Sequence, residues 1–75
     1  MRFIVAQTHN RYLWWCQEQE PPLNPLGPEV RYVRDISTLR GVATGFDYLC
    51  LEGWTDRSDW RAIYDVLTTR GRRPS

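Results

Sequence analysis

Few side chains in this sequence could do acid–base or metal chemistry, because the chain has a single histidine. His9 could form a proton-transfer pair or a partial metal site with Asp35 or Glu52. Asp35, Glu52 and Asp56 could together bind Mg²⁺. A lone histidine at a helix start is, however, usually a cap or a surface residue, and the three acids are equally well explained as caps or solvated loop residues. We therefore predict no catalytic residue, no metal and no cofactor.

The glycine-rich loops that hold nucleotide phosphates do not occur in this sequence. Neither G-x-x-x-x-G-K-[ST] nor G-x-G-x-x-G is present, and residues 7–10, the first predicted turn, contain no glycine. The backbone of that turn cannot approach a pyrophosphate as it does in dinucleotide-binding domains. The nucleophile elbow G-x-S-x-G does not occur either. We therefore do not expect an enzyme.

The segments that would position these residues alternate between strand and helix. Runs rich in β-forming residues predict strands over residues 2–6, 30–34 and 47–51. The third run is apolar on both faces after Asp47, which is typical of a strand buried on both sides of a parallel sheet.

Three segments have helical character. Thr8 or Asn10 can cap a helix over residues 11–20, and a short helical turn is expected within residues 36–44. The last helix carries the clearest amphipathic stripe in the sequence, which is formed by Trp60, Ile63, Tyr64 and Leu67.

The resulting order, β-α-β-short α-β-α, predicts an α/β fold with a three-stranded parallel sheet, because such strands join through right-handed crossovers. The strand order 2-1-3 would place helices on both faces, as in a truncated half of a Rossmann-like or flavodoxin-like fold. We predict one domain over residues 1–71 and a short basic C-terminal tail over residues 72–75.

In such a sheet, ligands bind beyond the carboxyl ends of the strands. Helix N-termini at that edge could also hold a phosphate or carboxylate. The candidate ligand-edge residues share this position after a predicted strand, and they are Thr8, His9, Asn10, Asp35, Glu52, Trp54 and Asp56.

Trp14 and Trp15 are the candidate interface residues. They are adjacent on a predicted helix, so they cannot both point into the core, and one should be exposed or lie in an interface. Tryptophan and tyrosine are favoured anchors of protein–protein interfaces. In the alternative interpretation, the many aromatic residues serve only to enlarge the small core of this 75-residue chain.

The net charge of +1 argues against a general attraction to nucleic acid or to membranes. All ten basic residues are arginine, a bias that fits a GC-rich genome. Arg70, Arg72 and Arg73 cluster near the C-terminus and are candidate phosphate contacts, although a basic tail is often only solubilising.

The two cysteines, Cys16 and Cys50, are too few for a disulfide scaffold, and we expect both to be reduced core residues. The sequence shows no secretory signal and no apolar run long enough for a membrane span. These features predict a cytoplasmic protein.

A series of short motifs resembles small open reading frames of actinobacteriophages, whose hosts have GC-rich genomes. The motifs are Arg2-Phe3-Ile4-Val5-Ala6, Trp15-Cys16, Val30-Arg31-Tyr32-Val33, Leu39-Arg40-Gly41, Gly53-Trp54, Asp59-Trp60 and Thr69-Arg70-Gly71. That family has no established activity, so the resemblance implies a context, the cytoplasm of a phage host, and no mechanism.

A second likeness is to the middle of phage terminase and helicase ATPase domains. In those domains a Leu-Arg-Gly motif precedes an apolar strand that ends in acidic residues. In this chain Leu39-Arg40-Gly41 likewise precedes an apolar run from Tyr48 that ends in Glu52. The sequence lacks the phosphate-binding loop, and Gly53 stands where a second acid would be expected. The likeness therefore implies at most an ATPase-like architecture that has been reused for binding.

We hypothesise a non-enzymatic phage accessory module that binds a host or phage protein or assembles with itself. A first alternative is a nucleic-acid-binding regulator whose phosphate contacts are Arg57, Arg61, Arg70, Arg72 and Arg73. A second alternative is a sensor of a small anionic ligand or nucleotide at the strand-end edge.

Overall fold

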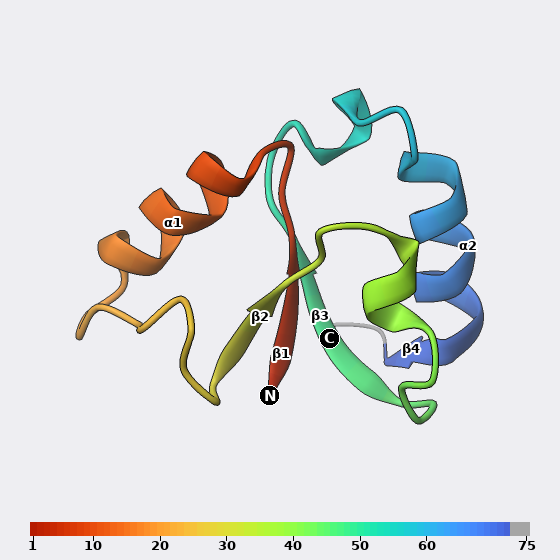
Figure 1. The fold of residues 1–75 in the computed structure, drawn as a ribbon, viewed down its shortest axis with the longest axis horizontal. Coiled ribbons are helices and arrows are strands. Elements are labelled where there is room, and N and C mark those ends of the chain that lie inside the picture. Colours follow the sequence, from red (N-terminus) through yellow and green to blue (C-terminus); the bar gives the residue numbers. More distant parts are fainter. Residues whose placement is uncertain (73–75) are drawn as a thin grey trace.

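Four parallel strands form one sheet in a computed structural model that describes residues 1–72 (Figure 1). The central pair is β1 (Arg2–Val5) and β3 (Phe46–Cys50). β2 (Val30–Tyr32) pairs with the other side of β1, and β4 (Gly71–Arg72) pairs with the other side of β3. The sheet order is therefore β2-β1-β3-β4.

The α/β class and the parallel sheet are confirmed, but the predicted number of three strands is wrong. The fourth strand contains only Gly71 and Arg72, too short a segment to show any hydrophobic periodicity. The backbone holds it in place, because Gly45 N–H donates to the Arg70 carbonyl and Phe46 lies in register with Gly71. Arg72, which we assigned to a tail, thus belongs to the sheet, while residues 73–75 lie outside the described residues.

Two α-helices and two 3₁₀ segments connect the strands. α1 spans His9–Glu18 and α2 spans Trp60–Arg70. The short 3₁₀ segments are η1 (Ile36–Leu39), which fulfils the expectation of a helical turn after β2, and η2 (Trp54–Asp56), which precedes α2.

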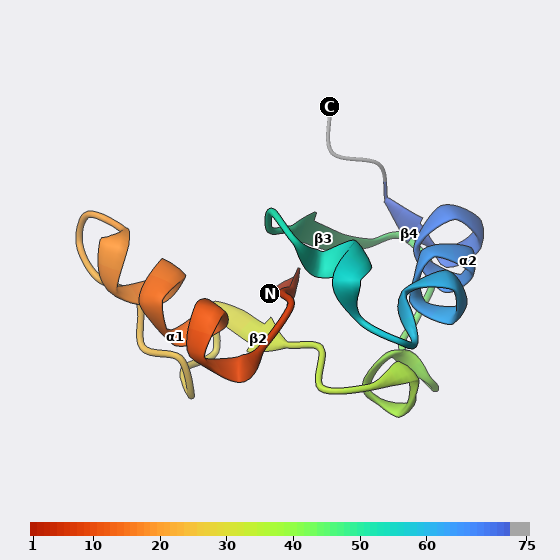
Figure 2. The ribbon, with the colours of Figure 1, turned by 90° about the horizontal axis from the view of Figure 1, so that it is seen from above.

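The two α-helices cover opposite faces of the sheet, and each lies toward a different end of it (Figure 2). The connection through α1 leads from β1 outward to β2, whereas the connection through α2 leads from β3 outward to β4. Right-handed crossovers in opposite directions place their helices on opposite faces. η1 packs on the same face as α2.

Alternate residues of β1 therefore enter two separate cores. The core beneath α2 and η1 contains Phe3, Val5, Val33, Leu39, Phe46, Ile63 and Leu67. The core beneath α1 contains Ile4, Ala6, Tyr12, Cys16 and Val30.

The face of the sheet that α1 covers is closed over β1 and open over β3. Ile4 of β1 is fully buried, whereas its neighbour across the ladder, Leu49, is only half-buried, as is Leu51 just after β3. Phe46 is the only buried residue of β3. The central position that this pattern favours is confirmed, since β3 has a strand on each side. The prediction that it is buried on both faces is wrong, because α1 lies toward β2 and no other helix of residues 1–72 packs on this face.

Replacement of Gly71 by alanine should destabilise the fold. A Cβ atom at this position would meet the Leu67 carbonyl oxygen and the Tyr48 ring, each at 2.7 Å. Forced overpacking of this kind costs about 1–3 kcal/mol. We expect urea unfolding of Gly71→Ala to show that loss, while Thr69→Ala, an exposed change in the same turn, stays within about 0.5 kcal/mol of the unaltered protein. An unchanged free energy of unfolding for Gly71→Ala would contradict the close packing of β4 on Tyr48.

Candidate functional site

The side chain of Arg57 lies at the carboxyl ends of the strands, where the sequence predicts a ligand site. Its guanidinium donates to the carbonyl oxygens of Ala6, Val33 and Arg34, at 3.2, 2.7 and 2.7 Å respectively. Ala6 follows β1, and Val33 and Arg34 follow β2. One cation therefore joins the ends of two neighbouring strands.

The same guanidinium forms a bidentate ion pair with Asp59, the N-cap residue of α2. Nε and Nη2 of Arg57 donate to the two carboxylate oxygens at 2.9 and 3.0 Å. All five N–H donors of the guanidinium are then engaged, and the Arg57 side chain is only 8% exposed. The ring of Tyr32 lies beside it, with its centroid 5.9 Å from the guanidinium carbon.

Arg57 and Asp59 occupy the positions at the strand-end edge that a ligand would otherwise use. In open parallel sheets, a ligand would bind at this edge and use free backbone groups or helix N-termini. Here the cation that meets the strand carbonyls is Arg57, and the anion at the start of α2 is Asp59. The protein thus supplies both charges from its own chain.

Two of the candidate ligand-edge residues are helix caps. The Thr8 hydroxyl accepts a hydrogen bond from the Arg11 backbone N–H at 3.3 Å and thereby begins α1. The Asp35 carboxylate accepts from the backbone N–H and from the hydroxyl of Ser37, and so begins η1. The Ser37 hydroxyl bond is the main reason why the pKa of Asp35 is lowered.

The acids after β3 and their neighbours do not converge on one point. Glu52 and Asp56 are exposed, and residues 1–72 hold no group of three or more metal-ligating side chains. Trp54 instead packs against the ring of Trp60 at 6.1 Å and stacks on that of Tyr64 at 6.5 Å between centroids. The magnesium site considered from the sequence is therefore not assembled by the described residues.

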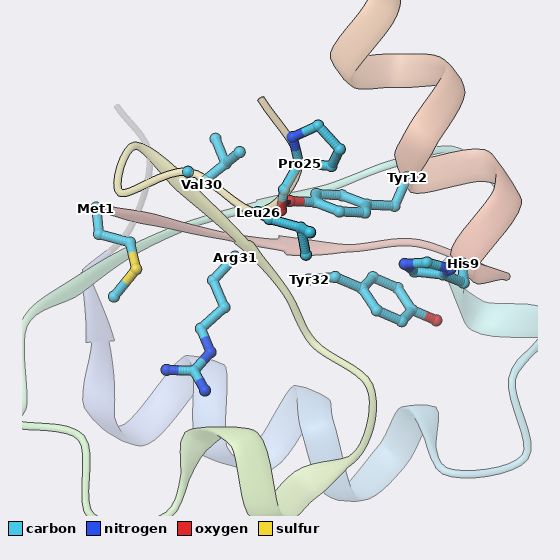
Figure 3. A pocket seen from close by; sticks show the side chains of 9 residues that line it. Met1, His9, Tyr12, Pro25, Leu26, Val30, Arg31 and Tyr32 are labelled. Carbon is cyan, nitrogen blue, oxygen red and sulfur yellow. Dashed lines mark hydrogen bonds between the residues drawn. The ribbon is translucent and has the colours of Figure 1, made fainter. Parts of the chain in front are cut away.

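His9 borders a groove of about 390 Å³ along β2 (Figure 3). It lies against aromatic residues of the core beneath α1, whereas Trp54 packs on the core of the other face. The His9 ring lies 5.2 Å from the Tyr32 ring and 6.0 Å from the Tyr12 ring, centroid to centroid. The Tyr12 hydroxyl donates to the Pro25 carbonyl at 2.6 Å. None of the described residues that line this groove is a carboxylate, so it offers His9 no acidic partner. Asn10 is exposed in the first turn of α1.

Of the candidate phosphate contacts, Arg70 already has a partner within the chain. Its guanidinium donates to the Val42 carbonyl, and this bond fastens the end of α2 to the loop after η1. Arg72 is exposed on β4, and Arg73 lies outside the described residues.

The adjacent tryptophans of α1 differ in exposure. Trp14 is 64% exposed, whereas Trp15 packs against the core beneath α1 and is half-buried. Both line a shallow groove of about 200 Å³ that also includes Leu51 and Glu52. The remaining residues along this groove, Arg11 and Glu18, belong to α1. We call this hollow the α1–β3 groove.

The two cysteines are free, and they belong to the cores on opposite faces of the sheet. Burial raises the pKa of the Cys16 thiol and raises that of Cys50 to about 11. Burial, with a smaller effect of Cys16, also raises the pKa of the Tyr12 hydroxyl to about 12. These groups are therefore neutral near pH 7, as expected of core residues.

Comparison with protein-family models, with curated proteins and with solved structures found no match for this chain. Within the described residues, no helix has the length and apolar character needed to cross a bilayer.

Sequence reasoning missed the principal polar group of the structure. Arg57 was considered only as a phosphate contact, although its spacing of two residues from Asp59 is compatible with a local ion pair. Its three carbonyl partners could not be found from sequence, because Ala6 and Val33 come close to Arg57 only after the sheet has formed.

Loss of the Arg57 side chain should strongly destabilise the protein. Arg57→Ala leaves three carbonyl oxygens and the half-buried Asp59 carboxylate without their donor, and a hydrogen bond to a charged group contributes about 1.5–3 kcal/mol. Arg57→Lys should restore only a minor part of the lost free energy of unfolding, since the lysine ammonium lacks the five coplanar N–H donors of a guanidinium. Urea unfolding measures both values, and the exposed change Arg31→Ala serves as the control. A lysine variant as stable as the unaltered protein would contradict the assigned geometry.

The thiol of Cys50 should be unreactive in the folded protein. With a pKa of about 11, only about one thiol in a thousand is ionised at pH 8, and the thiolate is the reactive form. The unfolded chain has the ordinary pKa of 9.0, so it releases the proton first, and the free energy of unfolding should fall as the pH rises from about 9 to about 11.

Titration with Ellman's reagent at pH 8 tests this expectation. Both thiols should react rapidly in urea and neither in the folded state. A native thiol that reacts at the rate of the unfolded chain would contradict it.

Proposed function

We propose that the protein is a non-enzymatic binding module that docks another protein chain in the α1–β3 groove. The observation that carries this proposal is the half-covered strand β3. Leu49 and Leu51 are only half-buried on the face that α1 leaves partly uncovered, and the 64% exposed Trp14 lines the same groove as Leu51. All-parallel sheets are almost always covered on both faces.

The chemical character of this surface supports a protein partner. Tryptophan is enriched among the residues that dominate binding energy at interfaces, and here Trp14 and Trp15 line the groove together with the aliphatic Leu51. The charged residues Arg11, Glu18 and Glu52 line the same groove. An apolar centre with a polar rim is the usual anatomy of a protein–protein interface.

The two alternative functions are less well supported. A sensor at the strand-end edge would need a ligand to displace the saturated Arg57–Asp59 pair. A nucleic-acid regulator would lose Arg57 as a phosphate contact, and the Arg70 guanidinium already donates to a backbone carbonyl. The net charge of +1 adds little attraction for a polyanion.

The proposal retains the context suggested by the short motifs. A phage accessory protein in the cytoplasm of its host would meet both host and phage proteins there. The partner can therefore be another protein or a second copy of this chain.

Site-specific photocrosslinking tests the location of the docking surface. Trp14 would be replaced by p-benzoylphenylalanine, and the same replacement of Tyr64, a 52% exposed aromatic residue on α2, serves as the matched control. We expect irradiation in an actinobacterial lysate to give a covalent adduct from position 14 and none from position 64. No adduct at position 14, or equal adducts at both positions, would contradict the proposal.

A further inference from the structure

The side of α1 that borders the α1–β3 groove carries a stripe that is complementary to itself. Arg11, Trp14 and Glu18 are exposed and lie at the helical spacing i, i+3 and i+7, with Trp15 beside them. All four residues line the α1–β3 groove, so the stripe faces the open part of the sheet. One end of the stripe is a cation, the other end is an anion, and the middle is aromatic.

From this pattern we infer that the occupant of the groove is a second copy of the chain, related by a twofold axis. Arg11 and Glu18 lie at equal distances from the midpoint between Trp14 and Trp15, since each is three and a half residues from it in sequence. At a rise of about 1.5 Å per residue, the two charges are separated by about 10.5 Å along the helix. Two antiparallel copies of α1 centred on that midpoint place each Arg11 opposite the Glu18 of the other copy.

The same arrangement covers the apolar part of the surface. The Trp14 side chains of the two copies meet near the axis, and each copy of α1 comes to lie over the open face of the other copy's β3. Leu49 and Leu51 then lose their contact with water. A twofold interface uses one patch twice, which is possible only when the patch is self-complementary.

The charges of the stripe are free to make these contacts. Within residues 1–72 the one ion pair between side chains joins Arg57 to Asp59, so neither Arg11 nor Glu18 is paired inside the chain. Opposite charges across an interface fix its register, and like charges in the same positions oppose it. The stripe therefore selects the antiparallel arrangement over a parallel one, in which like charges would meet.

This inference rests on the proposed function, and charge reversal tests it separately. Arg11→Glu and Glu18→Arg should each weaken the dimer at least about tenfold, because each creates two like-charged contacts per dimer. An equimolar mixture of the two variants should recover dimers, since every contact in the mixed pair joins opposite charges. Arg40→Glu, which reverses an exposed charge outside the groove, should leave dimerisation unchanged.

Sedimentation equilibrium of the purified full chain gives these dissociation constants, and far-ultraviolet circular dichroism shows that each variant is folded. A strictly monomeric unaltered protein, single variants that dimerise normally, or a mixture that stays monomeric would each overturn the inference. If the purified protein is monomeric while position 14 still crosslinks to a different protein in lysate, the inference fails and the proposed function stands. If neither dimer nor adduct forms, both fail.

Discussion

The guanidinium of Arg57 is the interaction on which the rest of the architecture depends. β1 and β2 end with carbonyl groups that point toward one place, and α2 begins nearby with the carboxylate of Asp59. A single planar cation with five donors satisfies both requirements at once. Without it, the strand ends and the start of α2 would each need water or a ligand. Arg57 thereby fixes the position of α2, which packs on the other half of the sheet, relative to the ends of β1 and β2.

Because Arg57 and Asp59 occupy the carboxyl ends of the strands, this sheet differs from other open parallel sheets in its ligand-binding position. Open parallel sheets bind ligands at the strand-end edge, whereas here that edge is occupied by the chain's own charges. The free surface lies elsewhere, because on its face of the four-stranded sheet α1 covers β1 and leaves β3 only partly covered. The exposed indole of Trp14 and the half-buried Leu51 line the groove at that surface, and Leu49 of β3 is also only half-buried. The polar groups at the carboxyl ends of the strands are thus already paired within the chain, whereas one face of the sheet is only partly covered. For this reason we propose that the protein binds its partner through that face.

The local patterns of the sequence were enough to predict the α/β class, the two helices and the exposure of one of two adjacent tryptophans. These features depend on periodicity and on the geometry of a single helix. The missed features depend on distant contacts. Arg57 meets Ala6 across 51 positions, and a two-residue strand such as Gly71–Arg72 has no pattern of its own. The apolar character of β3 was read correctly, but its burial depends on where α1 lies.

Intermolecular nuclear Overhauser effects in a mixture of isotope-labelled and unlabelled protein show which surfaces of two copies touch. We expect contacts between the Trp14 indole of one copy and α1 of the other, together with contacts to the methyl groups of Leu49 and Leu51. We expect no such contacts for the amides around Arg57. Intermolecular contacts confined to the strand-end edge around Arg57, with none at Trp14, would contradict this expectation.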